Sequence, residues 1–230
     1  MKKERKALLI ASLLVLCIAV GSLATYALMQ SVTKTATNVF ASDRNIGITL
    51  SEPDWEAHGS EDAKRYVPGQ IIDKDPQVTL NDNSVSAYVA LKVQYFEGVG
   101  DGEKQITYGE FKEKFLEDTK DGTRPMDFSE NWTLISTEAM KDKTENGTTD
   151  ISDVYMYNKI LTLDDASTQI KENVTEPLFT KVHLSSGLTA DNVTKLLPRF
   201  NIKVTAYAVQ SEGVQELEIG DILYEFVTSR

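Results

Sequence analysis

A strict two-residue alternation in two long segments is the feature that most constrains this fold. From residue 85 to 95 every second side chain is apolar: Val85, Ala87, Val89, Leu91, Val93 and Tyr95. A β-strand has this period, because successive side chains point to opposite faces of a sheet. The opposite face would hold Ser86, Lys92 and Gln94 together with Tyr88 and Ala90. Residues 202–208 repeat the alternation, so we expect two long strands that each turn one face to a core.

Shorter runs of β-prone residues extend this pattern. Residues 46–50, 132–137, 154–163 and 222–227 are rich in β-branched, aromatic and aliphatic side chains, and each is expected to form a strand. The linker between the second and third runs is polar and contains Asn146-Gly147, a strong turn pair. These two runs are therefore expected to pair as a hairpin with a long loop.

Helical signals are few. Thr107 followed three residues later by Glu110 matches a capping box, and Phe111, Phe115 and Leu116 then share one helical face. We expect this helix to pack across a sheet edge. A second short helix is expected to start near Ala190-Asp191 and to end by Pro198.

These elements predict the fold class and its boundaries. Many short strands with little helix indicate an all-β fold, an antiparallel β-sandwich of jelly-roll type with one or two short helices inserted. Residues 28–230 are expected to form a single domain, in which residues 28–44 are an extended N-terminal segment. Residues 1–27 are expected to stand apart from it.

The first 27 residues have the three parts of a secretory signal peptide. A basic start with Lys2, Lys3, Arg5 and Lys6 precedes the apolar run Ala7–Gly21, and small residues follow. Cleavage is expected after Ala27, with Ala24 as the alternative. An uncleaved membrane anchor is the other interpretation, because apolar character continues to Met29 and is just long enough to span a bilayer.

The exported part would be acidic and free of cysteine. The one cysteine, Cys17, lies in the apolar run, and Leu16 before it is not the small residue that a lipoprotein signal needs. The whole chain has a formal charge of −11; residues 1–27 hold four basic residues and one acidic residue, so the remainder carries −14. This balance disfavours partnership with nucleic acid or with anionic membranes. Membrane contact is expected only through an uncleaved signal segment.

The sequence contains no recognisable catalytic set, and we predict no catalytic, cofactor-binding or metal-ligating residue. His58 and His183 are the two histidines, and neither belongs to an HExxH pair. No GxSxG turn is present. The segment from Asp142 to Asp153 loosely matches a calcium loop with Gly147 at its sixth position, although an ordinary hairpin tip explains the same residues.

Ordered short motifs along the whole chain resemble one bacterial family. They are Ala24-Thr-Tyr-Ala27, Thr37-Asn-Val-Phe40, Ile48-Thr-Leu-Ser-Glu52 with Trp55, Pro68-Gly69, Lys74-Asp-Pro-Gln-Val78, Ala87–Val93, Asn131-Trp132, Tyr155–Leu161, Pro177–Val182 and Ile202–Gln210. Their order and spacing are similar to those of the TasA/camelysin group, which is exported through a SipW-type signal peptidase. The chain departs from that pattern at Leu28-Met29 and at Ala41-Ser42.

The resemblance implies a protein that is secreted to the extracellular space or the cell surface. Family members include biofilm matrix fibre proteins, and some are described as metalloendopeptidases. We therefore expect a non-catalytic matrix or surface protein that assembles through β-strand addition, with Leu28–Phe40 as the donor segment. Its expected partners are the signal peptidase, further copies of itself and other matrix proteins. The alternatives are a camelysin-like secreted metalloendopeptidase and a carbohydrate- or cation-binding surface module.

Overall fold

The structure is a computed structural model that describes residues 30–33, 46–118, 122, 124–136, 151–163, 172–192, 194, 196–213 and 218–229. The expected signal peptide, both candidate cleavage points and Cys17 lie outside these residues, as does Asn146-Gly147.

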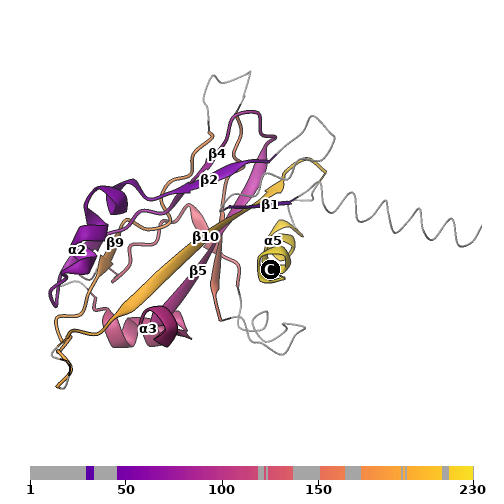
Figure 1. The fold of residues 1–230 in the computed structure, drawn as a ribbon. Helices are drawn as coiled ribbons and strands as arrows, with labels where there is room; N and C mark the ends of the chain where they lie inside the picture. Colours follow the sequence, from indigo (N-terminus) through magenta and orange to yellow (C-terminus); the bar gives the residue numbers. More distant parts are fainter. Residues whose placement is uncertain are drawn as a thin grey trace, which may run out of the picture.

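The largest sheet is built on the two long strands expected from the alternation. They are β5 (Ala87–Glu97) and β10 (Phe200–Gln210), which pair antiparallel along their full length. The sheet continues with β1 (Gln30–Thr33), β6 (Lys104–Ile106), β7 (Trp132–Leu134) and β8 (Asp153–Tyr157). Its order is β1-β10-β5-β8-β7, and β6 pairs with β5 beyond the end of β8 (Figure 1). The expected hairpin is confirmed, because β7 pairs antiparallel with β8.

Two smaller antiparallel pairs accompany this sheet. One joins β2 (Ile48–Ser51) to β4 (Gln77–Leu80), and the other joins β3 (Ile71–Asp73) to β9 (Lys181–His183). The described helical segments are η1 (Trp55–Gly59), α2 (Ser60–Lys64), η2 (Gly100–Gly102), α3 (Tyr108–Phe115) and α5 (Ile219–Thr228). The curled antiparallel sheets and few short helices confirm the all-β class and are compatible with a sandwich.

The expected capping-box helix is confirmed as α3. The Thr107 hydroxyl oxygen accepts the backbone N–H of Glu110 at 3.2 Å, and the Glu110 carboxylate accepts the Thr107 N–H at 2.9 Å. The helix buries Phe111 and Phe115 against the sheet. Phe111 lies 5.1 Å from Tyr95 between ring centroids, so the helix anchors the end of β5.

One face of the β5–β10 ladder faces the main core, as the alternation predicts. Val89, Leu91, Val93 and Tyr95 of β5 are completely buried there. They pack with side chains from several distant segments, among them Val78, Leu80, Phe111, Met126, Leu161, Leu178, Phe179 and Ala208. Burying one large apolar side chain stabilises the fold by about 1.5–3 kcal/mol, so this cluster is the main source of stability.

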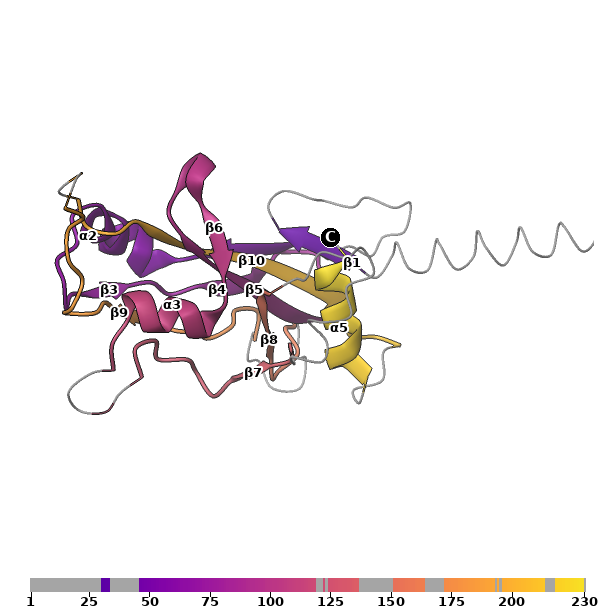
Figure 2. The ribbon, with the colours of Figure 1, turned by 90° about the horizontal axis from the view of Figure 1, so that it is seen from below.

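The opposite face is also buried, which the sequence interpretation missed. Residues 222–227 were expected to form a strand, but they lie inside the helix α5, so that prediction was wrong. Leu223, Phe226 and Val227 of α5 cover a second cluster that includes Tyr88 and Ala90 of β5. Figure 2 separates the two helices: α3 lies near one end of the long strands and α5 near the other.

The short helix expected at residues 190–198 does not form in the described residues of that segment. The Asp191 carboxylate instead accepts the backbone N–H of Thr194 at 2.7 Å and its hydroxyl at 3.0 Å. The Asp191 N–H donates to the Leu196 carbonyl at 2.9 Å. Asp satisfies the backbone locally here and so closes a turn, which is the alternative that Asp side chains offer to a helix.

Candidate functional site: the open half of strand β10

Strand β10 has two edges with different partners. Its inner edge pairs with all eleven residues of β5. Its outer edge pairs with β1 over four positions only, from Ala206 to Val209. Among the described strands none pairs with the outer edge from Phe200 to Thr205, which we call the open half of β10. An unpaired strand edge offers backbone N–H and C=O groups that can accept another strand.

The side chains of β10 become more exposed at the point where its pairing with β1 ends. Ala206, Ala208 and Val209 are at most 1% exposed, whereas every residue of the open half is at least partly exposed. Ile202 and Val204 of the open half nevertheless pack against the main core. The open half therefore contacts the main core and pairs with β5, while no described strand pairs with its outer edge.

A lysine marks the middle of the open half. Lys203 is the exposed residue of this stretch, and its ammonium pairs with Glu103. The same ammonium lies 4.3 Å from the centre of the Phe96 ring. A charged side chain on an edge strand is a common guard against uncontrolled pairing. Lys203 would therefore restrict which strands can pair with this edge.

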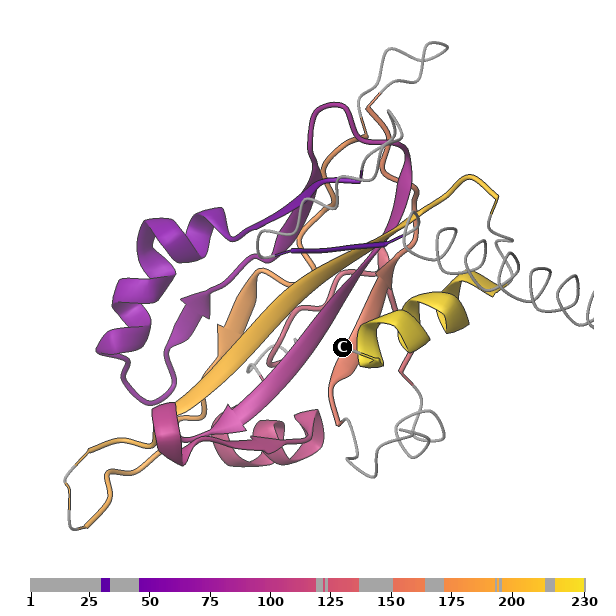
Figure 3. The ribbon, with the colours of Figure 1, turned by 45° about the vertical axis from the view of Figure 1, so that its right-hand side comes forward.

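The register between β1 and β10 shows how the N-terminal segment meets this edge. Gln30 lies opposite Val209 and Thr33 opposite Ala206, in antiparallel order. β1 belongs to the segment Leu28–Phe40 that the sequence singled out as a strand donor. Within one chain, part of that segment therefore already pairs with β10 (Figure 3).

The two histidines do not come together as a site. His58 is exposed in η1, and His183 is half-buried in β9. His183 Nε2 lies 3.7 Å from a Glu117 carboxylate oxygen. Glu117 in turn accepts the backbone N–H of Ser186 at 2.8 Å, so it holds a turn. No group of three His, Cys, Asp or Glu side chains with metal-site geometry occurs among the described residues.

A buried tyrosine cluster surrounds the last residue of the candidate calcium loop. Asp153 is 5% exposed at the start of β8, and the rest of the loop up to residue 150 lies outside the described residues. Burial, followed by the negative charge of Asp153, raises the pKa of Tyr108 to about 12 and raises that of Tyr155 further. These phenols remain protonated at neutral pH, so they supply no general base. The calcium hypothesis stays a prediction.

None of the described helices is long and apolar enough to cross a bilayer. Comparison of the chain with protein-family models, with curated proteins and with solved structures gave no match.

Proposed function

We propose that this protein is a secreted, non-catalytic component of the extracellular matrix or the cell surface that assembles by β-strand addition. In this proposal a SipW-type signal peptidase cuts after Ala27 and frees the segment Leu28–Phe40. That segment of one copy then pairs with the outer edge of β10 in the next copy. Repetition of a head-to-tail contact that does not close produces a fibre.

The pairing of β1 with β10 is the observation that carries this proposal. It supplies an acceptor edge, a donor and an antiparallel register. If the same register continues along the open half in a second copy, Thr35 lies opposite Val204, Thr37 opposite Ile202 and Val39 opposite Phe200. The donor is then long enough to cover the whole open half. Main-chain hydrogen bonds give affinity in such an addition, and alternate side chains give specificity.

The intact chain also explains why assembly would be controlled. Its own β1 occupies four positions of the acceptor edge, and an internal segment competes at a high effective concentration. A donor from another copy that pairs along the open half as well would form more main-chain hydrogen bonds than these four positions provide. Growth is therefore expected to depend on protein concentration and to be slow at first.

The test removes the donor from one partner and supplies it separately. Mature protein that starts at Leu28 should form fibres visible by electron microscopy, and the same protein without residues 28–40 should not. A peptide of residues 28–40 should bind the truncated protein with one-to-one stoichiometry.

Matched peptides make the binding test specific. A Val32→Pro peptide loses a backbone donor and should bind at least tenfold more weakly, whereas a Val32→Thr peptide keeps the strand and should bind normally. Unchanged fibres from the truncated protein would overturn the proposal. So would equal binding of the Pro and Thr peptides.

A further inference from the structure

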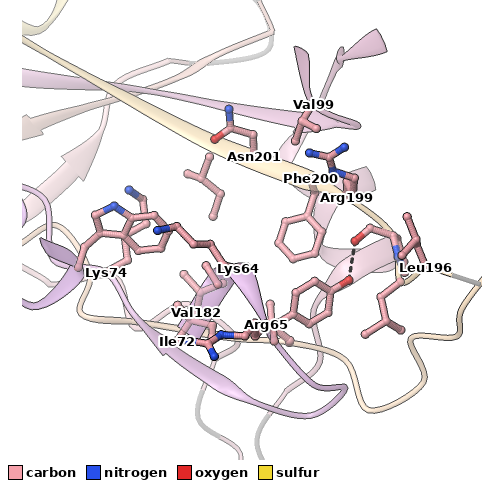
Figure 4. A pocket seen from close by; sticks show the side chains of 17 residues that line it. Lys64, Arg65, Ile72, Lys74, Val99, Val182, Leu196, Arg199, Phe200 and Asn201 are labelled. Atoms are coloured by element: carbon pink, nitrogen blue, oxygen red, sulfur yellow. Dashed lines mark hydrogen bonds between the residues drawn. The ribbon is translucent and has the colours of Figure 1, made fainter. Parts of the chain in front are cut away.

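A cavity of about 570 Å³ lies where β10 begins. Its walls come from η1, α2, β3 and β9 on one side and from residues 196–202 on the other (Figure 4). Trp55, Tyr66 and Phe200 supply aromatic surface, and Ile72 and Val182 supply aliphatic surface. This volume and this apolar lining are typical of pockets that hold small organic ligands.

The charges around this cavity have one sign. Every charged side chain that lines it is basic: Lys64, Arg65, Lys74 and Arg199. The chain as a whole has 35 acidic and 24 basic residues. The lining of the cavity is therefore basic in a protein with an excess of acidic residues, and this local positive charge would attract an anion.

The four cations differ in how far they are already neutralised. Lys74 Nζ contacts both carboxylate oxygens of Glu52 at 2.7 and 2.8 Å, so its charge is balanced. Lys64 and Arg65 share the single carboxylate of Glu61 at the exposed surface, where ion pairs contribute little. Arg199 is exposed, and among the described residues no acidic side chain forms an ion pair with it.

Arg199 is thus the lining cation without an acidic partner among the described residues, and Lys64 is held only by an exposed ion pair with Glu61. Lys64 extends from α2 into the hollow, and Arg199 stands beside Phe200 on the β10 side (Figure 4). Tyr66 also lines the cavity, and its hydroxyl donates to the Pro198 carbonyl. Burial raises the Tyr66 pKa, so this phenol stays neutral and does not repel an anion. At the mouth, Leu196 leaves 61% of its surface exposed and extends the apolar wall outward.

We propose that this cavity binds a small organic anion with an apolar body and one carboxylate head. The body lies against Trp55, Tyr66 and Phe200, and the head accepts hydrogen bonds from Arg199, while Lys64 adds positive charge to the lining. Guanidinium and ammonium donors bind a carboxylate more strongly than neutral donors do. This inference does not rest on the proposed assembly, since the walls belong to the folded domain and not to residues 28–40.

Calorimetric titration of the mature protein with decanoate, below the concentration at which decanoate forms micelles, tests the proposal. We expect saturable binding with one site per chain. Decanol has the same body without the charge and should bind roughly tenfold more weakly, the size of effect that one charge-assisted contact gives. Arg199→Gln should weaken decanoate binding by a similar factor, and Lys64→Gln should weaken it less, because Glu61 already balances part of the Lys64 charge. Leu196→Ser should weaken decanoate and decanol alike.

Lys159→Gln is the matched control, because it removes one exposed positive charge outside the cavity and should leave the affinity unchanged. The same titration on protein that lacks residues 28–40 separates this proposal from the assembly. Binding that survives there without fibre growth supports the pocket alone. Absence of saturable binding, or equal affinities for Arg199→Gln and Lys159→Gln, would overturn the pocket.

Discussion

The two faces of the β5–β10 ladder are buried in different ways. One face contacts the main core, which draws on β2, β4, α3 and the segments around Leu161 and Phe179. The other face contacts a smaller cluster whose cover is the single helix α5. The first face is thus held from many points of the sequence, whereas the second depends on one element near the C-terminal end of the chain.

This difference indicates that the two faces contribute differently to the stability of the fold. Loss of any contributor to the main core should weaken the whole fold, because its members share contacts. Loss of α5 should expose the second face and leave the first face packed, since elements with few buried contacts open locally at lower free energy. A lysine also ties α5 to the ladder: Lys92 Nζ lies 3.5 Å from the Val227 carbonyl, near the negative end of the helix dipole.

The largest effect is expected for Phe111→Ala in the main core. Phe111 is completely buried and contacts the rings of Tyr95, Phe115 and Phe200. Its truncation should lower the free energy of unfolding by about 3–5 kcal/mol, measured by urea denaturation. Leu196→Ala is the control, because Leu196 is largely exposed and should change stability by less than about 0.5 kcal/mol. A loss near that of the control would contradict the assignment of this face as the main core.

A smaller and more local effect is expected for Leu223→Ala in α5. Leu223 is completely buried in the second cluster, so its truncation should cost about 2–3 kcal/mol. Hydrogen exchange should show the amides of α5 losing protection before those of β5 and β10. Glu225→Ala alters the exposed side of the same helix and should leave exchange unchanged. If β5 lost protection together with α5, the two faces would form a single cooperative unit.

The same contrast explains how much of the fold could be predicted. Strand β5 and helix α3 were predictable, because period-two alternation and a capping box are local signals. Helix α5 was missed because its apolar run includes β-branched and aromatic residues and was assigned as a strand. The spacing of Ile219, Leu223 and Phe226 is nevertheless helical, and this signal could have identified it.

The open half of β10 could not be predicted in this way. The sequence led us to expect Leu28–Phe40 as a donor, and that expectation stays a prediction. Which strand would receive it depends on sheet order, and sheet order is set by pairing between distant segments. The cavity escaped prediction for the same reason. Lys64 and Arg199 are far apart in the chain and become neighbours of one hollow only through folding.

The smallest of the expected effects is a loss of folding stability at alkaline pH, and it should arise on the main-core face. Burial raises the pKa of Tyr108 to about 12 and that of Tyr155 further, and both rings pack on the main-core side. An unfolded tyrosine titrates near pH 10, so above that pH the unfolded chain loses protons that the folded protein keeps. Stability is therefore full below pH 10 and falls as the pH rises toward the folded pKa, and the buried Tyr155 alone should cost about 1.4 kcal/mol by pH 11.

Urea midpoints measured from pH 8 to 11 would reveal this decline. Tyr155→Phe removes the more buried of the two groups and should flatten the alkaline decline clearly. Tyr108→Phe should flatten it less, because water reaches Tyr108 more easily and screens its surroundings. The difference between each variant and the parent isolates the tyrosine from lysines that titrate in the same range. Parallel declines in the parent and in Tyr155→Phe would show that the main-core face does not govern alkaline stability.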